Sequence, residues 1–443
     1  MNPQSVLPAN IRDGRSDLAD FGEERLDALQ RHAFEYFLHQ TNPVNGLVAD
    51  KSQPGAPASI AAVGFALACY PVGIERGWIT RADAIKRILA VLRFFRHSTH
   101  DATTNATGYK GFYYHFLDMR TGRRSGRCEL STVDTGFLLA GMLAAACFLD
   151  QDDEQEHEIR DLTELLYSRV DWQWACNDRA SLTHGWKPES GFLAYRWQGY
   201  DEALLLYVLG LGSPTHPLPV ESYAAWVSTY QWKTVDGYEC LYGGPLFIHQ
   251  YSHCWLDLRG IQDAFMRDKG IDYFENSRRA TYAQRAYATR NPMEFEGYGA
   301  DCWGLTASDG PGPTTRRIGG IERTFFDYIA RGTPYGPDDG TIAPWAVVAS
   351  LPFAPEIVLP TIRHLQDTYP QASGKYCFRC SINSTYSTDS DVPWVSNYHF
   401  GINLGPVVIM CENFRSDLVW RLMRACPHIV TGLRRAGFTQ GWL

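Results

Sequence analysis

The feature that most constrains the fold of this chain is a helical periodicity that recurs along most of its length. In residues 23–39, for example, Leu26, Leu29 and Phe37 fall on one face of a helix, as in an amphipathic helix packed on a core. Similar patterns predict further helices at 81–95, 131–149, 154–169, 201–210, 253–268, 276–290, 356–368 and 412–425. These segments share no fixed repeat length, which argues against an α-solenoid.

Long connections rich in glycine, proline and aromatic residues separate the predicted helices. They cover residues 101–128, 171–200, 228–249, 291–320 and 374–405. Loops of this length usually carry functional residues. Because no low-complexity linker divides the chain, the sequence predicts a disordered N-terminal tail at 1–20 and one all-α domain at 21–437. Alternating short and long loops favour helical hairpins wrapped into a toroid.

Composition and charge exclude several classes of function. The formal net charge is −8 and no basic tract offsets it, which argues against nucleic-acid binding. The most apolar segment, 136–149, is too short to cross a bilayer, so we expect no membrane association. Eleven cysteines, an odd number, favour a reducing compartment over a disulfide framework. We expect a cytoplasmic protein, or a periplasmic or secreted one if a signal peptide has been removed.

One loop, YGADCWGLTASDGP at 298–311, combines residue types that suit a sugar ligand. Trp303 offers a flat apolar face, Asp309 offers hydrogen-bond acceptors, and Gly304 and Gly310 let the backbone approach a ligand closely. A sugar ring has C–H faces that stack on aromatic side chains and hydroxyls that need polar partners. The loop therefore indicates carbohydrate binding, with a purely structural glycine-rich turn as the alternative.

Seven segments together resemble the glucoamylase-like family, which contains bacterial endo-β-1,2-glucanases and a domain of cyclic β-1,2-glucan synthases. They are ELSTVDTG at 129–136, YDEALLLYVLGLGSPTHPLP at 200–219, PLFIHQYSHCWLDLRG at 245–260, YFENSRRATYAQRAYA at 273–288, the loop at 298–311, DGTIAPWAVVASLPFAPE at 339–356 and GINLGPVVIMCENFRSDLVW at 401–420. The resemblance covers most of the chain. It implies an (α/α)6 toroid that acts on a β-1,2-linked glucan without a cofactor.

The best candidate for a general acid is Glu202. Glycoside cleavage needs an acid that protonates the leaving oxygen and a second carboxylate that activates water or attacks the anomeric carbon. The resemblance places the family's acid at Glu202 and a substrate contact at Tyr200. A general acid needs a raised pKa, which the helix dipole opposes and burial would favour. Without the resemblance, the simpler interpretation is a carboxylate at a helix start, with Asp201 as the cap.

A second pair of carboxylates, Glu129 and Asp134, flanks another predicted helix start. Ser131 followed by Asp134 fits a loosened capping box, so one interpretation is that Asp134 only caps the helix. The resemblance places this helix start beside the acid. It implies that Glu129 or Asp134 positions water, binds a sugar hydroxyl or serves as the second catalytic carboxylate.

A third group of candidates recurs at four-residue intervals. On one helix, His249, His253 and Asp257 would align as three potential zinc ligands. The HExxH pattern is absent, however, and the resemblance implies that His249, Gln250, Tyr251 and His253 bind sugar hydroxyls or support the site. Histidines satisfied within the core are a third interpretation. We expect no metal.

One departure from the family affects the mechanism. Relatives often have Gly-Ile-Asp-Gln-Gly-Pro where this chain has GINLGP, so Asn403 stands in place of an aspartate. An amide cannot act as a general base, and another carboxylate would have to activate water, such as Asp134, Asp309, Asp389 or Asp391. Asn403 itself is still expected to contact the glucan.

The sequence as a whole predicts a glycoside hydrolase that cleaves β-1,2-glucan or its oligosaccharides. Because of Asn403, a retaining transglycosylase and a non-catalytic glucan-binding protein are the alternatives. Substrate chain length, endo or exo action, stereochemical outcome and oligomeric state stay open.

Overall fold

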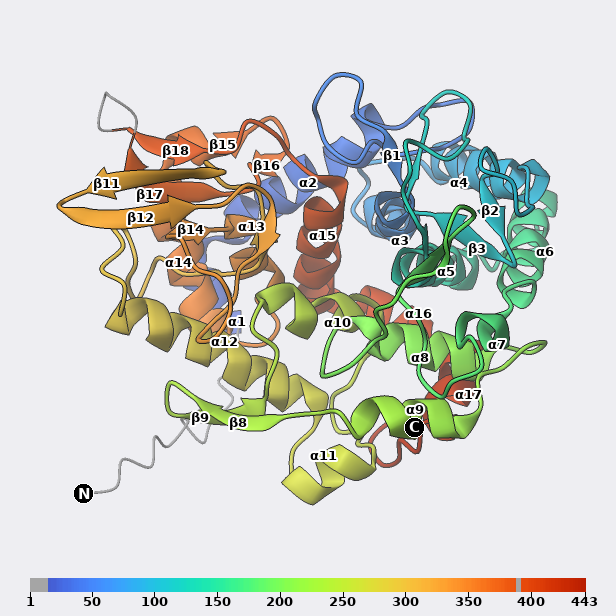
Figure 1. The fold of residues 1–443 in the computed structure, drawn as a ribbon. Helices are drawn as coiled ribbons and strands as arrows, with labels where there is room; N and C mark the ends of the chain where they lie inside the picture. The colour runs from blue at the N-terminus through green and yellow to red at the C-terminus, as the bar shows by residue number, and fades with distance from the viewer. Residues whose placement is uncertain (1–14, 388–391) are drawn as a thin grey trace.

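The computed structural model describes residues 15–387 and 392–443, and helices dominate it (Figure 1). The helices are α1 Arg15–Phe21, α2 Glu23–His39, α3 Ile60–Glu75, α4 Arg81–His97, α5 Thr132–Phe148, α6 Glu154–Ser168, α7 Trp172–Ala175, α8 Ala203–Gly212, α9 Val220–Val227, α10 Tyr251–Trp255, α11 Ala264–Lys269, α12 Tyr273–Arg290, α13 Pro344–Ala349, α14 Pro355–Thr368, α15 Gly401–Ser416, α16 Leu418–Ala425 and α17 Pro427–Arg435, with short 3-10 helices η1 Leu246–His249 and η2 Pro370–Ala372. The predicted helix-rich class is confirmed.

Short strands accompany the helices, and the sequence did not predict them. They are β1 Ala58–Ser59, β2 Gly108–Tyr109, β3 Phe112–Tyr114, β4 Phe116–Leu117, β5 Leu130–Ser131, β6 Gly185–Lys187, β7 Gly191–Phe192, β8 Trp232–Val235, β9 Tyr238–Leu241, β10 Ala307–Ser308, β11 Thr314–Ile318, β12 Ile321–Phe325, β13 Ile329–Ala330, β14 Thr341–Ile342, β15 Ser373–Gly374, β16 Cys377–Phe378, β17 Ile382–Ser387 and β18 Pro393–Val395. The largest sheet has the order β2-β3-β5-β6-β7, and all of its pairs are antiparallel. Most strands have two or three residues, too few for an alternating apolar pattern.

The helices divide into two kinds by their burial. Every residue of α8 is buried, and almost every residue of α3, α5, α13 and α15 is buried as well. By contrast, α2, α4, α6 and α14 bury one face only. A helix that is apolar all round needs neighbours on every side, whereas an amphipathic helix can face water. The first kind therefore forms the interior and the second covers it.

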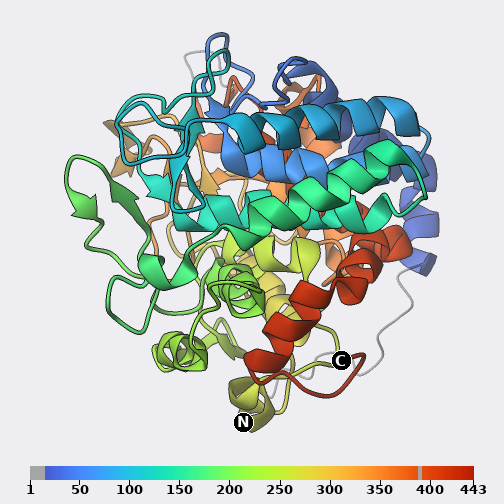
Figure 2. The ribbon, with the colours of Figure 1, turned by 90° about the vertical axis from the view of Figure 1, so that its right-hand side faces the viewer.

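The interior helices pack against one another. α3 packs on α5 and α15, α5 on α8, α8 on α10, and α15 on α10 and α13. The backbones of α3 and α5 touch, because a Cβ on Gly141 would lie 2.0 Å from the carbonyl oxygen of Gly64. Figure 2 shows α3 and α5 beside the covering helices α4 and α6.

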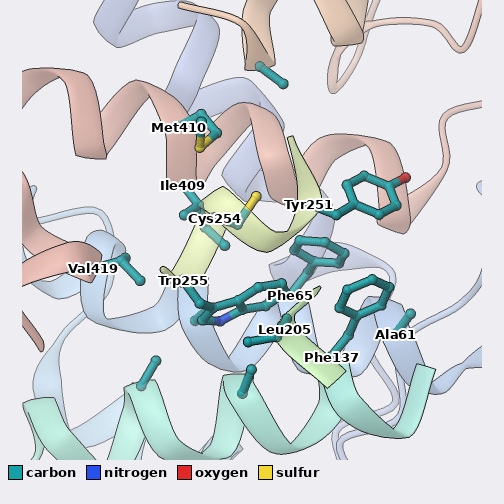
Figure 3. Close-up of a cluster of buried hydrophobic side chains, with 14 of the residues drawn as sticks. Ala61, Phe65, Phe137, Leu205, Tyr251, Cys254, Trp255, Ile409, Met410 and Val419 are labelled. Atoms are coloured by element: carbon teal, nitrogen blue, oxygen red, sulfur yellow. The ribbon is translucent and has the colours of Figure 1, made fainter. Parts of the chain in front are cut away.

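The interior helices meet around a cluster of aromatic side chains (Figure 3). Phe65 of α3 lies 4.9 Å from Trp255 of α10 between ring centroids, and Phe137 of α5 stacks on the same indole at 5.7 Å. Tyr251 of α10 contacts both phenylalanine rings. These contacts fix the beginnings of three helices relative to one another.

Three predicted boundaries are wrong, each for a local reason. The predicted helix at 253–268 is interrupted, since α10 ends at Trp255, Gly260 has a φ of 72° and α11 begins only at Ala264. The predicted helix at 412–425 is two helices, because Asp417 between them has a φ of 58°. Residues 15–20 of the predicted disordered tail form part of α1. Residues 1–14 lie outside the described part of the chain.

Within residues 15–387 and 392–443, no helix combines the length and the apolar character that crossing a bilayer requires. All eleven cysteines are free thiols.

Candidate active site

The N-terminal ends of several interior helices bring the predicted site residues together. Asp134 lies in the first turn of α5, Glu202 directly precedes α8, Tyr251 begins α10 and Asn403 lies in the first turn of α15. The backbone carbonyl of Asp50, in the segment before α3, accepts a 2.9 Å hydrogen bond from the first residue of α15. The positive ends of these helix dipoles therefore share one region with the carboxylates.

The carboxylate of Glu202 is not used to cap its helix. Asp201 takes that role, since its Oδ1 accepts a 3.0 Å hydrogen bond from the backbone N–H of Ala203. The Ser252 hydroxyl holds the helix start by donating to the Glu202 carbonyl oxygen at 3.1 Å. Burial, with a smaller contribution from the charge of Asp134, raises the pKa of Glu202 to about 7. Desolvation thus outweighs the helix dipole, as a general acid requires.

Asp134 is buried and is held by its own helix start. The Ser131 hydroxyl donates to Asp134 Oδ2 at 2.5 Å and accepts a 3.3 Å bond from the Asp134 backbone N–H. Ser131 is therefore the cap of α5, and the carboxylate of Asp134 makes no capping bond to a backbone N–H. The interpretation that Asp134 only caps the helix does not fit this geometry.

A histidine that no motif indicated, His115, joins the two carboxylates of the α5 start. Its Nδ1 lies 2.9 Å from Glu129 Oε1, and its Nε2 lies 3.7 Å from Asp134 Oδ2. Burial opposes the protonation of His115, but Asp134, Glu129 and Asp50 together raise its pKa to about 9. The hydrogen bond to His115 in turn lowers the pKa of Glu129 to about 2.

Two further aspartates, Asp50 and Asp309, complete the group. Burial raises the pKa of Asp50 to about 6; the charges of Asp134 and Asp309 act in the same direction and those of His115 and Lys51 against it. Burial also raises the pKa of Asp309, whose Oδ2 accepts a 2.8 Å hydrogen bond from the Ser396 hydroxyl. We call Asp50, Glu129, Asp134, Glu202 and Asp309 the carboxylate cluster.

Asn403 lies close to the Asp309 side of the carboxylate cluster. Its Nδ2 donates to Cys380 Sγ at 3.3 Å, and the same sulfur accepts the backbone N–H of Asp309 at 3.4 Å. The Oδ1 of Asn403 is buried and has no hydrogen-bond partner within the described residues. An amide with one free acceptor can bind a water or a sugar hydroxyl, but it cannot accept a proton as a base.

Tyr251 links the carboxylate cluster to the core. Its ring packs among the core aromatics, and its hydroxyl points away from them (Figure 3). The hydroxyl donates to the carbonyl oxygen of Ile402 at 3.4 Å. Burial, reinforced by the charges of Glu202 and Asp134 among others, raises the pKa of Tyr251 well above its usual value. The structure thus places Tyr251 within electrostatic reach of both carboxylates.

The other predicted substrate-binding residues lie in the interior. His249 Nε2 lies 2.9 Å from the Gly243 carbonyl oxygen, and His253 Nε2 lies 3.0 Å from Ser277 Oγ. The amide of Gln250 donates to the Ala346 carbonyl oxygen at 2.6 Å and to Ser350 Oγ at 2.8 Å. Burial lowers the pKa of His249 to about 4 and that of His253 to about 3, so both imidazoles are neutral near pH 7.

Trp303 and Tyr200 also belong to the interior, which corrects the prediction that they contact a sugar. Trp303 is 0% exposed, and its indole N–H donates to Thr361 Oγ1 at 3.0 Å. Tyr200 is buried against Tyr230 and Tyr273. Neither ring offers a face to a ligand. Loop 298–311 folds Trp303 inward, and the neighbouring tyrosine rings cover Tyr200. We call Tyr200, His249, Gln250, His253 and Trp303 the buried polar set.

The zinc-like spacing of His249, His253 and Asp257 does not build a metal site. Asp257 lies beyond the end of α10 and forms ion pairs with Arg259 at 2.7 Å and Arg424 at 3.0 Å. Across residues 15–387 and 392–443, no group of three or more histidine, cysteine or acidic side chains has the arrangement of a metal site. Asp389 and Asp391, two of the predicted alternative bases, lie outside the described residues.

Sequence reasoning missed Asp50 and His115. Asp50 stands in the non-periodic segment LVADKS, and His115 is a single polar residue in the aromatic stretch FYYHF. Neither belongs to a spaced motif, and each reaches the site only through pairing between segments that are distant in sequence. The one available signal was a charged residue within an apolar segment, which also fits an ordinary surface position.

Comparisons with known proteins identify a family and several relatives of this chain. The family model Glycoamylase, described as “Putative glucoamylase”, matches residues 194–427. A curated protein of Parabacteroides distasonis, “Exo beta-1,2-glucooligosaccharide sophorohydrolase (non-reducing end)”, is 29% identical over 451 residues. That match covers 93% of this chain and 58% of the curated protein, so the chain spans little more than half the length of this relative.

Two solved structures match almost end to end. A protein of Bacteroides uniformis, also described as a “putative glucoamylase”, is 30% identical, with 98% of this chain and 99% of that chain covered and a TM-score of 0.83. An endo-beta-1,2-glucanase from Chitinophaga pinensis, in complex with sophorotriose and glucose, is 27% identical, with 95% and 99% covered and a TM-score of 0.84. Since the family model matches more than half of the chain and the first structure is 30% identical over nearly all of it, this protein belongs to the Glycoamylase family.

Proposed function

We propose that this protein is a glycoside hydrolase that cleaves β-1,2-glucan or β-1,2-gluco-oligosaccharides. The observation that carries the proposal is the environment of Glu202, a carboxylate at a helix start that is not used as a cap and whose pKa is about 7. Such a group is protonated in a large fraction of molecules near neutral pH and can donate its proton. The substrate class is supported by the names of the relatives from Parabacteroides distasonis and Chitinophaga pinensis.

In the proposed reaction, Glu202 is the general acid and Asp134 is the second carboxylate. The bond between the anomeric carbon and the leaving oxygen breaks, and the leaving oxygen takes the proton of Glu202. Asp134 either accepts a proton from the attacking water or itself attacks the anomeric carbon. Its support is that its carboxylate makes no capping bond and that its charge acts on Glu202. Asp309 is the alternative partner, and Glu129 acts through His115.

We further propose that Tyr251, Asp309 and Asn403 contact the glucan. Tyr251 and Asp309 carry polar groups beside the catalytic carboxylates, and Asn403 has a free acceptor there. Sugar hydroxyls need both donors and acceptors, which these three side chains supply. The glucan contacts predicted for the buried polar set are not part of the proposal.

We also infer that the interior helices close into the ring of an (α/α)6 toroid, with α3, α5, α8, α10, α13 and α15 inside. The contacts of α3 with α5, α5 with α8, α8 with α10, and α15 with both α13 and α3 support this arrangement. The bond from the Gln250 amide to the Ala346 carbonyl oxygen joins the start of α10 to α13. In such a ring the N-terminal ends would surround one common site.

Incubation with linear β-1,2-glucan tests the proposal. We expect shorter products and new reducing ends, and we expect Glu202→Gln to lose both while it keeps its fold. A wild-type protein that changes neither chain length nor reducing ends would refute hydrolysis. An active Glu202→Gln variant would refute the assignment of the acid.

Asn403 supports a second candidate function, that of a retaining β-1,2-glucan transglycosylase. Asn403 cannot be a base, so in this course Glu202, which gave up its proton in the first step, accepts the proton of a sugar hydroxyl. That hydroxyl takes the place of water and attacks the anomeric carbon as the bond to Asp134 breaks. Product analysis separates the two activities, since a transglycosylase redistributes chain lengths or forms cyclic products with few new reducing ends. A non-catalytic binder would show calorimetric binding and no products.

A further inference from the structure

His115 lies beside three members of the carboxylate cluster, Glu129, Asp134 and Asp50, although the proposed reaction gives it no proton transfer of its own. It lies between β3 and β4, where its backbone N–H donates to the Glu129 carbonyl oxygen at 3.0 Å. Its own carbonyl oxygen accepts the N–H of Ile60, the first residue of α3, at 3.2 Å. The imidazole stacks on Phe116, with ring centroids 3.9 Å apart and an interplanar angle of 14°. Backbone and ring are therefore both fixed.

We propose that His115 is a positioning residue: as an imidazolium held between Glu129 and Asp134, it fixes the orientation of the Asp134 carboxylate. The catalytic part of this inference rests on the proposed function, in which Asp134 is the second carboxylate. The structural part, a charged histidine that bridges two carboxylates, does not depend on it.

The placement of a carboxylate at each ring nitrogen favours the charged ring. A neutral imidazole has one N–H and can donate to one carboxylate only. His115 presents Nδ1 to Glu129 at 2.9 Å and Nε2 to Asp134 at 3.7 Å, so both ring nitrogens face acceptors. The 2.9 Å contact is a hydrogen bond, and the 3.7 Å contact is an electrostatic one that a small movement would tighten. Protonation gives each carboxylate an N–H.

The surrounding charges favour it as well. Asp50 adds a third negative charge beside the ring, and together the three carboxylates overcome the cost of burying the cation. The charges that face these carboxylates from neighbouring segments include Lys187, beside Glu129, and Lys51, beside Asp50. The ring of His115 thus places a cation 3.7 Å from Asp134.

The positioning role predicts how the kinetic parameters respond. A misoriented Asp134 would slow the chemical step and leave glucan binding largely intact. We therefore expect the loss of His115 to lower kcat more than it changes KM.

The first test is a direct titration that needs no substrate. In protein labelled with ¹⁵N-histidine, NMR should show the His115 ring with a midpoint near pH 9, while His249 and His253 stay neutral near pH 7. A His115 midpoint at or below 6.5 would overturn the inference whether or not the protein hydrolyses glucan.

The second test compares His115→Gln with a matched histidine variant. Glutamine keeps a donor but no charge, and we expect kcat to fall at least tenfold while KM changes less than threefold. His428→Gln is the control, because it removes a histidine that lies 2.7 Å from Glu164 at the surface contact of α17 with α6. The control should keep the kcat and KM of the wild type.

A third variant, Glu129→Gln, disturbs the contacts of His115 without replacing the histidine, in case His115→Gln does not fold. Glu129→Gln leaves the imidazole in place and removes its hydrogen-bonded carboxylate partner, so kcat should fall by less than in His115→Gln. A folded His115→Gln protein with the kcat of the wild type would overturn the inference. If the wild-type protein does not act on β-1,2-glucan, the proposed function fails, and the titration alone decides on His115.

Discussion

The carboxylate cluster and the buried polar set contain similar residue types but treat them in opposite ways. In the buried polar set, His249, Gln250 and His253 are neutral and hydrogen-bond to backbone or hydroxyl groups. In the carboxylate cluster, five acidic side chains share one region, and two of them, Glu202 and Asp50, have strongly raised pKa values. Neutral groups that hydrogen-bond stabilise a fold, although Gln250 Oε1 and His253 Nδ1 have no partner within the described residues, whereas buried charges are retained at a cost in stability. We therefore expect substitutions in the buried polar set to change stability and substitutions in the carboxylate cluster to change activity.

The histidines show the same contrast within one residue type, since their pKa values differ between the two groups. Burial lowers the pKa of His249 and His253 far below neutrality, because no carboxylate lies beside them to compensate. Around His115 the carboxylates overcome burial and raise the pKa to about 9. A histidine in the sequence therefore says little about its charge until its partners are known.

The largest expected effect follows from removal of the second carboxylate. Asp134→Asn should lower kcat by about 10² to 10⁴-fold, the range typical of a general base or nucleophile, because an amide accepts no proton. The variant keeps the size of the side chain and can still accept the Ser131 hydroxyl bond, so its melting temperature should stay close to that of the wild type. Kinetics on β-1,2-gluco-oligosaccharides measure the effect. Asp309→Asn is the comparison, and a larger loss there would exchange the two roles.

The pH dependence of the wild-type protein is the next largest effect. Since the acid must be protonated and the pKa of Glu202 is about 7, kcat/KM should fall toward tenfold per pH unit above pH 7. The measurement should stop near pH 8.5, because His115 loses its proton around pH 9. Circular dichroism at each pH controls for unfolding. A flat profile from pH 6.5 to 8.5 would remove Glu202 as the titrating acid.

A substitution in the buried polar set should affect stability alone. Trp303→Phe removes the indole N–H that bonds Thr361 and leaves a small cavity, so we expect a loss of about 2 kcal/mol in the free energy of unfolding. KM for β-1,2-glucan should stay within twofold of wild type, because the ring faces the core. A large rise in KM without a loss of stability would restore Trp303 as a sugar-binding side chain.

The smallest expected effect concerns the stability cost of a carboxylate. The folded-state pKa of Asp50 is raised from 3.8 to about 6, so the native state binds more protons than the unfolded state between these values, and stability falls as pH rises through this window. Asp50→Asn should therefore stabilise the protein at pH 7, by about 1 kcal/mol after allowance for solvent screening. Urea unfolding at pH 7 and at pH 4 measures the difference, which should vanish at pH 4.

Periodicity and capping residues were enough to predict most helices, because long amphipathic or apolar segments carry their own signal. Ser131 and Thr80 cap α5 and α4 as expected. The interior helix α3 was missed, since it is buried on all sides and contains Pro71, so no polar face marks its period. The first half of α15 was missed for a similar reason, with Pro406 inside it.

The site could be predicted only in part. Glu202, Asp134 and Asp309 were predicted because they stand in segments that resemble a family. The charge of Asp134 acts on Glu202, and those of Asp134 and Asp309 act on Asp50, so the carboxylates lie near one another, while their roles stay predictions. Trp303 was misplaced, because a polar glycine-rich loop can turn its tryptophan inward as easily as outward. Its burial is set by contacts with α14, more than fifty residues away in the chain. His115 depends on similar long-range pairing, which a single sequence does not reveal.

The most direct test measures activity and stability together in Glu202→Gln and Trp303→Phe, with linear β-1,2-glucan as the substrate and urea unfolding on the same preparations. We expect opposite outcomes for the two variants. Glu202→Gln should lose at least 10²-fold in activity and keep or gain stability, whereas Trp303→Phe should lose stability and keep the activity of its folded fraction. Full activity in Glu202→Gln, with wild-type protein that generates reducing ends, would contradict the claim that the carboxylate cluster performs the chemistry through this acid.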